Sequence, residues 1–93
     1  MYKLVNAVKR NEESPNTFHI PTAEEISMVK VGTFVKLIFE ENGQGERMWV
    51  GVYFAKDGHF EGMLDNEPVK ISSLKIRGKV TFKSENIIDI LKV

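Results

Sequence analysis

Apolar and polar residues alternate most clearly in two segments near the middle of the chain, residues 33–40 and residues 48–55. A period of two is typical of strands that bury one face only, so both segments are predicted to be β-strands. The apolar positions are Val35, Leu37 and Phe39 in the first segment and Met48, Val50, Val52 and Phe54 in the second. The loop Asn42-Gly43-Gln44-Gly45 is expected to join them as a hairpin.

The turn residues Lys56-Asp57-Gly58 predict a second hairpin, and their geometry decides its register. A two-residue turn at Asp57-Gly58 would place Phe54 opposite Glu61 and turn carboxylates into the core. A three-residue loop with a left-handed Gly58 instead pairs Phe54 with Phe60. We expect the second register because it keeps the core face apolar. That face consists of Val50, Val52, Phe54, Phe60 and Leu64.

The first third of the chain carries helical signals. Leu4, Val5 and Val8 have helical spacing and predict a short amphipathic helix that ends before Ser14-Pro15-Asn16. Thr22 and Glu25 match a capping box at the start of a second short helix, which ends near residues 31–32. Residues 1–31 are therefore expected to form a helical segment that packs on a sheet.

The last third predicts further strands. Residues 69–71 and 79–83 are expected to be strands, with Val80 and Phe82 pointing inward, and residues 72–74 are expected to form one helical turn between them. The β-branched segment 87–91 is expected to close the sheet, although its spacing also suits a helical turn.

These elements predict an α+β, mostly β fold. The expected architecture is a small, strongly bent antiparallel five-stranded sheet or an SH3-like barrel, with one or two short N-terminal helices. The 93 residues contain no internal repeat or linker, so they are predicted to be a single domain, 1–93, with the helical segment at 1–31 and the barrel at 33–93.

Composition narrows the possible functions. The chain has no cysteine, and its 13 basic and 13 acidic residues cancel. Disulfides and thiolate metal sites are thereby excluded, and no global field attracts nucleic acid or anionic lipid. His19 and His59 lack partners at metal-ligand spacing, so neither a metal site nor a cofactor is expected. With no long apolar run, we expect a cytoplasmic protein without a membrane span.

The face of the central hairpin that points away from the core carries the candidate site. In the expected register Trp49 lies opposite Asp65, Gly51 opposite Met63, and Tyr53 opposite Glu61. Tryptophan, tyrosine and arginine are enriched at binding hot spots. The candidate partner-binding residues are Arg47, Trp49, Tyr53, Met63, Asp65 and Asn66. In the alternative interpretation an N-terminal helix covers Trp49, and Arg47 and Asp65 form a structural ion pair.

Three functions are compatible with this face. The leading hypothesis is a non-catalytic module that binds another protein. The second is an enzyme on a small polar substrate, with Asp65 as general base and Arg47 as anion clamp; no complete catalytic motif supports it. The third is a nucleic-acid adaptor with a basic stripe, which is disfavoured because acidic residues interrupt the stripe. Its cations would be Lys70, Lys75, Arg77, Lys79 and Lys83.

Several short motifs resemble those of a bacterial family, domain of unknown function 2314. They are GERMWV at 45–50, LDN at 64–66 after a D-G turn, F-x-I-P-[ST]-x-E-E-I at 18–26, G-x-x-V at 32–35 and LK-x-x-x-x-V-x-F at 74–82. The resemblance runs from about residue 6 to residue 89 and implies a small cytoplasmic β-rich domain with no established reaction. The family is similar to immunity proteins of polymorphic toxin systems, which bind and neutralise a toxin domain.

Within that resemblance, Arg47, Trp49, Asp65 and Asn66 match the family pattern. The pattern usually has an acidic residue where this chain has Gly51. The departure means that any activity depending on that carboxylate is not expected here.

Overall fold

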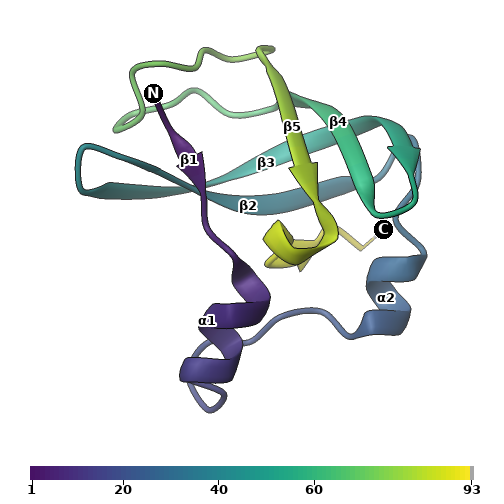
Figure 1. The fold of residues 1–93 in the computed structure, drawn as a ribbon. Helices are drawn as coiled ribbons and strands as arrows, with labels where there is room; N and C mark the ends of the chain where they lie inside the picture. The colour runs from purple at the N-terminus through teal and green to yellow at the C-terminus, as the bar shows by residue number, and fades with distance from the viewer. Residues whose placement is uncertain (93) are drawn as a thin grey trace.

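A single curled antiparallel sheet makes up most of the protein. The structure is a computed structural model, and it describes residues 1–92. Figure 1 shows the sheet bending into a half-barrel with two short helices on one side. The strands run in the order β1-β2-β3-β4-β5, and β6 also pairs with β2. Their bounds are β1 Lys3–Leu4, β2 Phe34–Glu41, β3 Gln44–Lys56, β4 His59–Leu64, β5 Lys79–Lys83 and β6 Asp89–Ile90. The predicted mostly β class, with a strongly bent sheet, is confirmed.

The two ends of the chain share one edge of β2. β1 pairs with β2 at residues 39–40, and β6 pairs with it at residues 35–36. Asn86, in the 3₁₀ helix η1 Ser84–Asn86, ties the two ends together because its buried amide donates to the Val5 carbonyl at 3.0 Å. The expected closing strand at 87–91 is thus present as a two-residue pairing.

The N-terminal helices differ from the prediction at two boundaries, the start of the first helix and the end of the second, which ends at Ser27 rather than near residues 31–32. α1 spans Ala7–Glu13 rather than starting near Leu4, since Leu4 is extended and pairs with Phe39. Asn6 begins the helix by accepting the Lys9 N–H at 3.0 Å. α2 spans Ala23–Ser27, and the predicted capping box of Thr22 and Glu25 is confirmed. No helix within residues 1–92 is long and apolar enough to cross a membrane.

Apolar side chains gather on both faces of β2. The larger cluster fills the concave side of the sheet and contains Val35, Leu37, Phe39, Met48, Val50, Val52, Phe60, Leu64, Val80 and Phe82. A smaller cluster on the other face joins Val5, Ala7, Ile38 and Ile88, with Phe18 and Ile20 packed against it. The N-terminal segment therefore packs against the second face of β2 around Ile38.

The central hairpin combines features of both registers considered from the sequence. Val50 pairs with Leu64 and Val52 with Gly62, as expected. The turn nevertheless contains two residues, Asp57 and Gly58, with φ of 51° and 76°. A β-bulge between Val52 and Phe54 absorbs the one-residue difference.

The bulge moves one predicted core residue to the surface. Phe54 lies opposite Glu61 rather than Phe60, and it is 45% exposed. Its predicted core position was wrong, because a bulge places consecutive side chains on the same side. Ala55 turns inward in its place and pairs with Phe60. Tyr53 and Phe54 therefore both face solvent.

The loop 66–78 replaces a predicted strand at 69–71 and a predicted helical turn at 72–74, both of which were wrong. Five consecutive backbone N–H groups of this loop donate to two glutamate side chains from the β2–β3 hairpin. Glu46 accepts from Val69 at 2.9 Å, Lys70 at 2.8 Å and Ile71 at 3.2 Å. Glu41 accepts from Ser72 at 2.7 Å and Ser73 at 3.3 Å. These N–H groups therefore bind carboxylates instead of the backbone carbonyls that they would bind in a strand or a helix.

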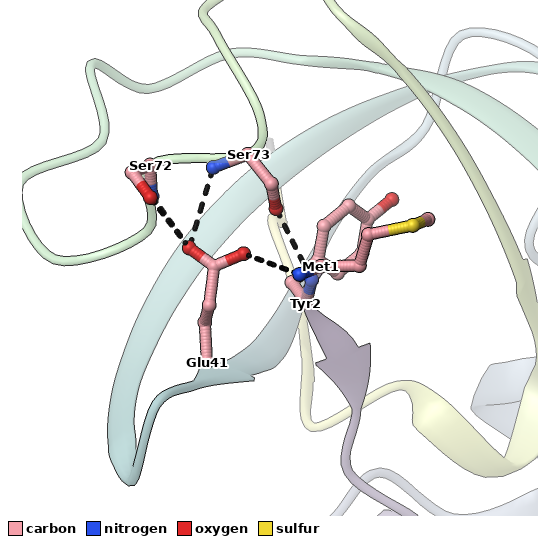
Figure 2. Close-up of polar contacts among 5 residues, drawn as sticks. All are labelled: Met1, Tyr2, Glu41, Ser72 and Ser73. Atoms are coloured by element: carbon pink, nitrogen blue, oxygen red, sulfur yellow. Dashed lines mark hydrogen bonds and ion pairs between the residues drawn. The ribbon is translucent and has the colours of Figure 1, made fainter.

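Glu41 also connects this loop to the start of the chain. Figure 2 shows its carboxylate between Ser72 and Ser73 on one side and Met1 on the other. The second oxygen, Oε2, lies 3.4 Å from the Met1 ammonium, and Ser73 Oγ accepts the Tyr2 N–H at 3.1 Å. The Glu41 side chain is only 3% exposed. Its charge is thus held by donors from two distant segments.

These contacts lower the pKa of both carboxylates. Hydrogen bonds from Ser73 and Ser72 lower the pKa of Glu41 from 4.5 to about 2, although burial opposes ionisation. For Glu46, burial again raises the pKa, but the N–H groups of Lys70, Val69 and Ile71 outweigh it and the net shift is downward. Both groups stabilise the fold in their charged form.

Gly62 provides a test of the packing beneath the hairpin. A Cβ at this position would lie 2.4 Å from Val50 Cγ1 and 2.7 Å from the Gly51 carbonyl oxygen. We expect Gly62→Ala to lower the free energy of unfolding by about 1–3 kcal/mol, measured by urea denaturation. Gly45→Ala is the matched control because its nearest neighbours would be 3.9 Å away. Equal stability of the two variants would contradict the close packing.

Glu41 predicts an acid-dependent loss of stability. Its folded-state pKa, about 2, lies below the ordinary 4.5, so its contribution is complete above pH 4.5 and is lost as the pH falls toward about 2. Glu41→Gln should be less stable than wild type at neutral pH and should lose less stability on acidification, measured by urea denaturation across this range. Glu67→Gln, at an exposed position, should keep the wild-type pH dependence. A Glu41→Gln variant that loses as much stability on acidification as wild type would contradict this assignment.

Candidate functional site

The convex side of the central strands carries the candidate residues. We define the outer face as Phe34 and Lys36 of β2, Arg47, Trp49, Gly51 and Tyr53 of β3, and Met63 of β4. Phe34, Gly51 and Met63 form one row across three strands because they are in direct register. The sheet therefore brings Arg47, Trp49, Tyr53 and Met63 together on one surface, as the alternation predicts.

The middle of this face is apolar and open to solvent. Tyr53 and Met63 are each 46% exposed, and Phe34 is 37% exposed. Leu91 extends the patch, since its N–H donates to the Phe34 carbonyl at 2.9 Å and its side chain is 49% exposed. Exposed apolar groups that adjoin one another in this way are a recognised mark of interaction surfaces.

Gly51 does not leave the depression that its missing side chain suggests. The ring of Phe34 lies over it, and a Cβ at position 51 would come within 3.0 Å of Phe34 Cε2. The aromatic ring thus occupies the place where a larger residue would project. The face is consequently smooth at its centre rather than hollow.

Trp49 is half-buried, and it is held by a lysine at its ring and by hydrogen bonds at its backbone. Lys36 Nζ lies 4.8 Å from the centroid of its ring, a cation–π contact. The two residues after β4 pair the backbone polar groups of Trp49. The Trp49 N–H donates to Asn66 Oδ1, and the Trp49 carbonyl accepts the Asp65 N–H at 2.9 Å. The Asn66 side chain therefore ends the β3–β4 pairing.

Arg47 lies at the edge of the outer face, next to the N-terminal segment. Its guanidinium carbon is 5.9 Å from the centroid of the Phe18 ring, and that of Arg10 approaches the same ring at 5.7 Å. Asn11 holds this segment by donating to the Phe18 carbonyl at 2.7 Å. Within residues 1–92 no ion pair joins Arg47 to Asp65, so the alternative of a structural pair between them does not hold.

Three residues at this site were missed from the sequence. Phe34 and Lys36 alternate with the apolar residues of β2, so the pattern already placed them on the outer face. Their register with Gly51 and Trp49 required knowledge of the Asn42-Gly43 turn. Phe18 gave no local signal, because a long connection brings it to Arg47.

The charged groups offer little for catalysis or for a polyanion. Asp65 is exposed, whereas the enzyme hypothesis places it in an enclosed cleft. Lys79 of the basic stripe is paired with Glu61 at 3.5 Å. In the described part of the chain no group of three or more histidine or acidic side chains is placed to hold a metal ion.

Comparison with known proteins places the chain in a family. No curated protein and no solved structure matches it. One family model matches residues 2–93, nearly the full length, and its description is "Uncharacterized protein conserved in bacteria". The family resemblance inferred from the short motifs is thus confirmed. The chain belongs to the DUF2314 family.

Proposed function

We propose that this protein is a non-catalytic module that binds another protein through the outer face. The observation that carries the proposal is the pair of exposed side chains Phe34 and Met63, in one row on either side of Gly51 and flanked by the exposed Tyr53. These side chains project from three paired strands, so little conformational freedom would be lost on binding. Tyr53 at the centre of the face, and Trp49 and Arg47 toward its edge, are residue types enriched at binding hot spots.

The shape of the face favours a protein over a small substrate. Small-molecule sites are concave and enclose most of their ligand. Here the Phe34 ring fills the space above Gly51, and the exposed apolar groups lie on the convex side of the sheet. Such a surface suits the broad apolar centre of a protein interface.

The specific form of the proposal is an immunity-type role, in which the partner is a toxin domain that binding neutralises. Its support is the similarity between the DUF2314 family and immunity proteins of polymorphic toxin systems. A rigid, preformed face agrees with this role because inhibitory complexes of proteins commonly bind with little backbone change.

Site-specific photo-cross-linking in the producing cells tests the proposal. A photoreactive phenylalanine analogue at Tyr53 keeps an aromatic ring at the centre of the outer face. We expect it to cross-link one discrete protein, because the interface would bury this ring. The same analogue at Thr81, an exposed position on β5 outside the apolar row, is the control.

A second substitution checks that the captured protein uses the face. Met63→Ser should weaken binding of the purified partner by about tenfold or more, measured by calorimetry, while leaving thermal stability nearly unchanged. The proposal is wrong if Tyr53 and Thr81 give the same cross-links, or if neither gives any. Loss of the partner's toxicity on binding would establish the immunity-type role.

A further inference from the structure

A recess lies at the edge of the outer face, between the N-terminal segment and the sheet. It has a volume of about 240 Å³, and its lining includes Phe18, His19, Lys36, Arg47, Ile88 and Asp89. Three separate parts of the chain meet there: the connection between the helices, the strands β2 and β3, and the C-terminal segment. Two cationic side chains, Lys36 and Arg47, line it from adjacent strands.

Both cations lie against aromatic rings, and neither forms an ion pair among residues 1–92, although Asp89 is in register with Lys36. Arg47 lies over Phe18, and Lys36 lies over Trp49 at 4.8 Å. Within residues 1–92 neither side chain forms an ion pair, whereas Arg10 nearby is paired with Glu40. Contact with the ring leaves the edge of the guanidinium free to donate hydrogen bonds. The two groups are therefore held in place with their donors unused.

The charge of the recess suits a single negative group. Lys36 and Arg47 contribute two positive charges, Asp89 contributes one negative charge, and His19 is counted as neutral, which leaves a net charge of +1. Asp89 Oδ1 already accepts the Ile90 N–H at 2.8 Å. A carboxylate carries one charge, and its two oxygens match the planar donor pair of arginine. A phosphate dianion would exceed the available charge.

We propose that Arg47 and Lys36 form a receptor for a carboxylate, supplied by an aspartate or glutamate side chain of the bound protein. The inference rests on the proposed function and names the chemistry of its partner: an apolar surface that meets Phe34, Tyr53 and Met63, with an acidic residue beside it. The acidic residue enters the recess while the apolar groups cover the centre of the outer face. The charge pair fixes the orientation of the partner.

The lone tryptophan supplies a direct measurement. Trp49 contacts Lys36, so a carboxylate that draws Lys36 toward itself will change the fluorescence of Trp49. We expect a tetraglutamate peptide, titrated at low ionic strength, to produce a saturable change that tetraglutamine does not. Arg47→Gln should weaken this binding by about tenfold or more, since it removes a charge-assisted pair of hydrogen bonds.

Two further variants separate the geometry from the charge. Arg47→Lys keeps the charge but loses the planar donor pair, so its affinity should lie between those of wild type and Arg47→Gln. Lys75→Gln removes an exposed cation outside this recess and should bind the peptide as wild type does. Thermal unfolding of each variant checks that the fold is retained.

Three results would overturn the inference: no saturable fluorescence change in the wild type, equal affinity of wild type and Arg47→Gln, or tighter binding of inorganic phosphate than of the peptide. These results are separate from those that test the proposed function. Cross-linking from Tyr53 without peptide binding would remove the carboxylate receptor and leave the docking face in place. Peptide binding without any cross-link would remove the docking face and leave only the carboxylate site.

Discussion

Two carboxylates of one hairpin organise the part of the chain that forms no regular structure. Glu46 and Glu41 together accept the N–H groups of five consecutive residues, 69–73. Without them those amides would need solvent or another partner, because a backbone donor left unpaired in the interior costs free energy. The loop returns the chain from β4 to β5, so its anchoring sets where the last long strand begins.

The same anchoring reaches the candidate site from both directions. The loop begins at Asn66, whose side chain accepts the Trp49 N–H, while the Asp65 N–H donates to the Trp49 carbonyl. In the middle of the loop Ser73 Oγ accepts the Tyr2 N–H, which holds β1 beside β2 and so positions the N-terminal segment. That segment carries Phe18 to Arg47. The hydrogen bonds between Glu41 and the loop thus support the contact between Phe18 and Arg47 on the outer face, although the two groups of residues do not touch.

Much of the fold could be predicted because its strands follow simple alternation. The strand cores, the inward positions of Val80 and Phe82, and the capping box at Thr22 all depend on local spacing. The bulge at Tyr53 could not be predicted this way, since each register was treated as continuous and a bulge changes register within one strand. The strand predicted at 69–71 was wrong for a different reason: the N–H groups of this segment bind a side chain that is distant in sequence.

For the site, alternation predicted which residues share a face but not what lies beside them. Trp49, Tyr53 and Met63 could be placed together from the sequence, whereas the recess needs Phe18 and Asp89 from opposite ends of the chain. Long-range contacts of this kind arise from tertiary packing, and local patterns carry no signal for them.

The glycine at position 51 determines how the Phe34 ring lies on the outer face. A Cβ there would come within 3.0 Å of Phe34 Cε2, so any larger residue would require the ring to shift by a few tenths of an ångström. With glycine, the ring lies over position 51, in the same row as Met63. The charged groups of the face lie at its edge, where Lys36 and Arg47 form no ion pair among residues 1–92. An acidic residue at position 51, in register with Phe34 and two pairs away from Lys36 and Trp49 on the same face, would offer Lys36 a counter-charge. The surface that we propose for recognition, an apolar centre with cations at its edge, therefore depends on a glycine at position 51.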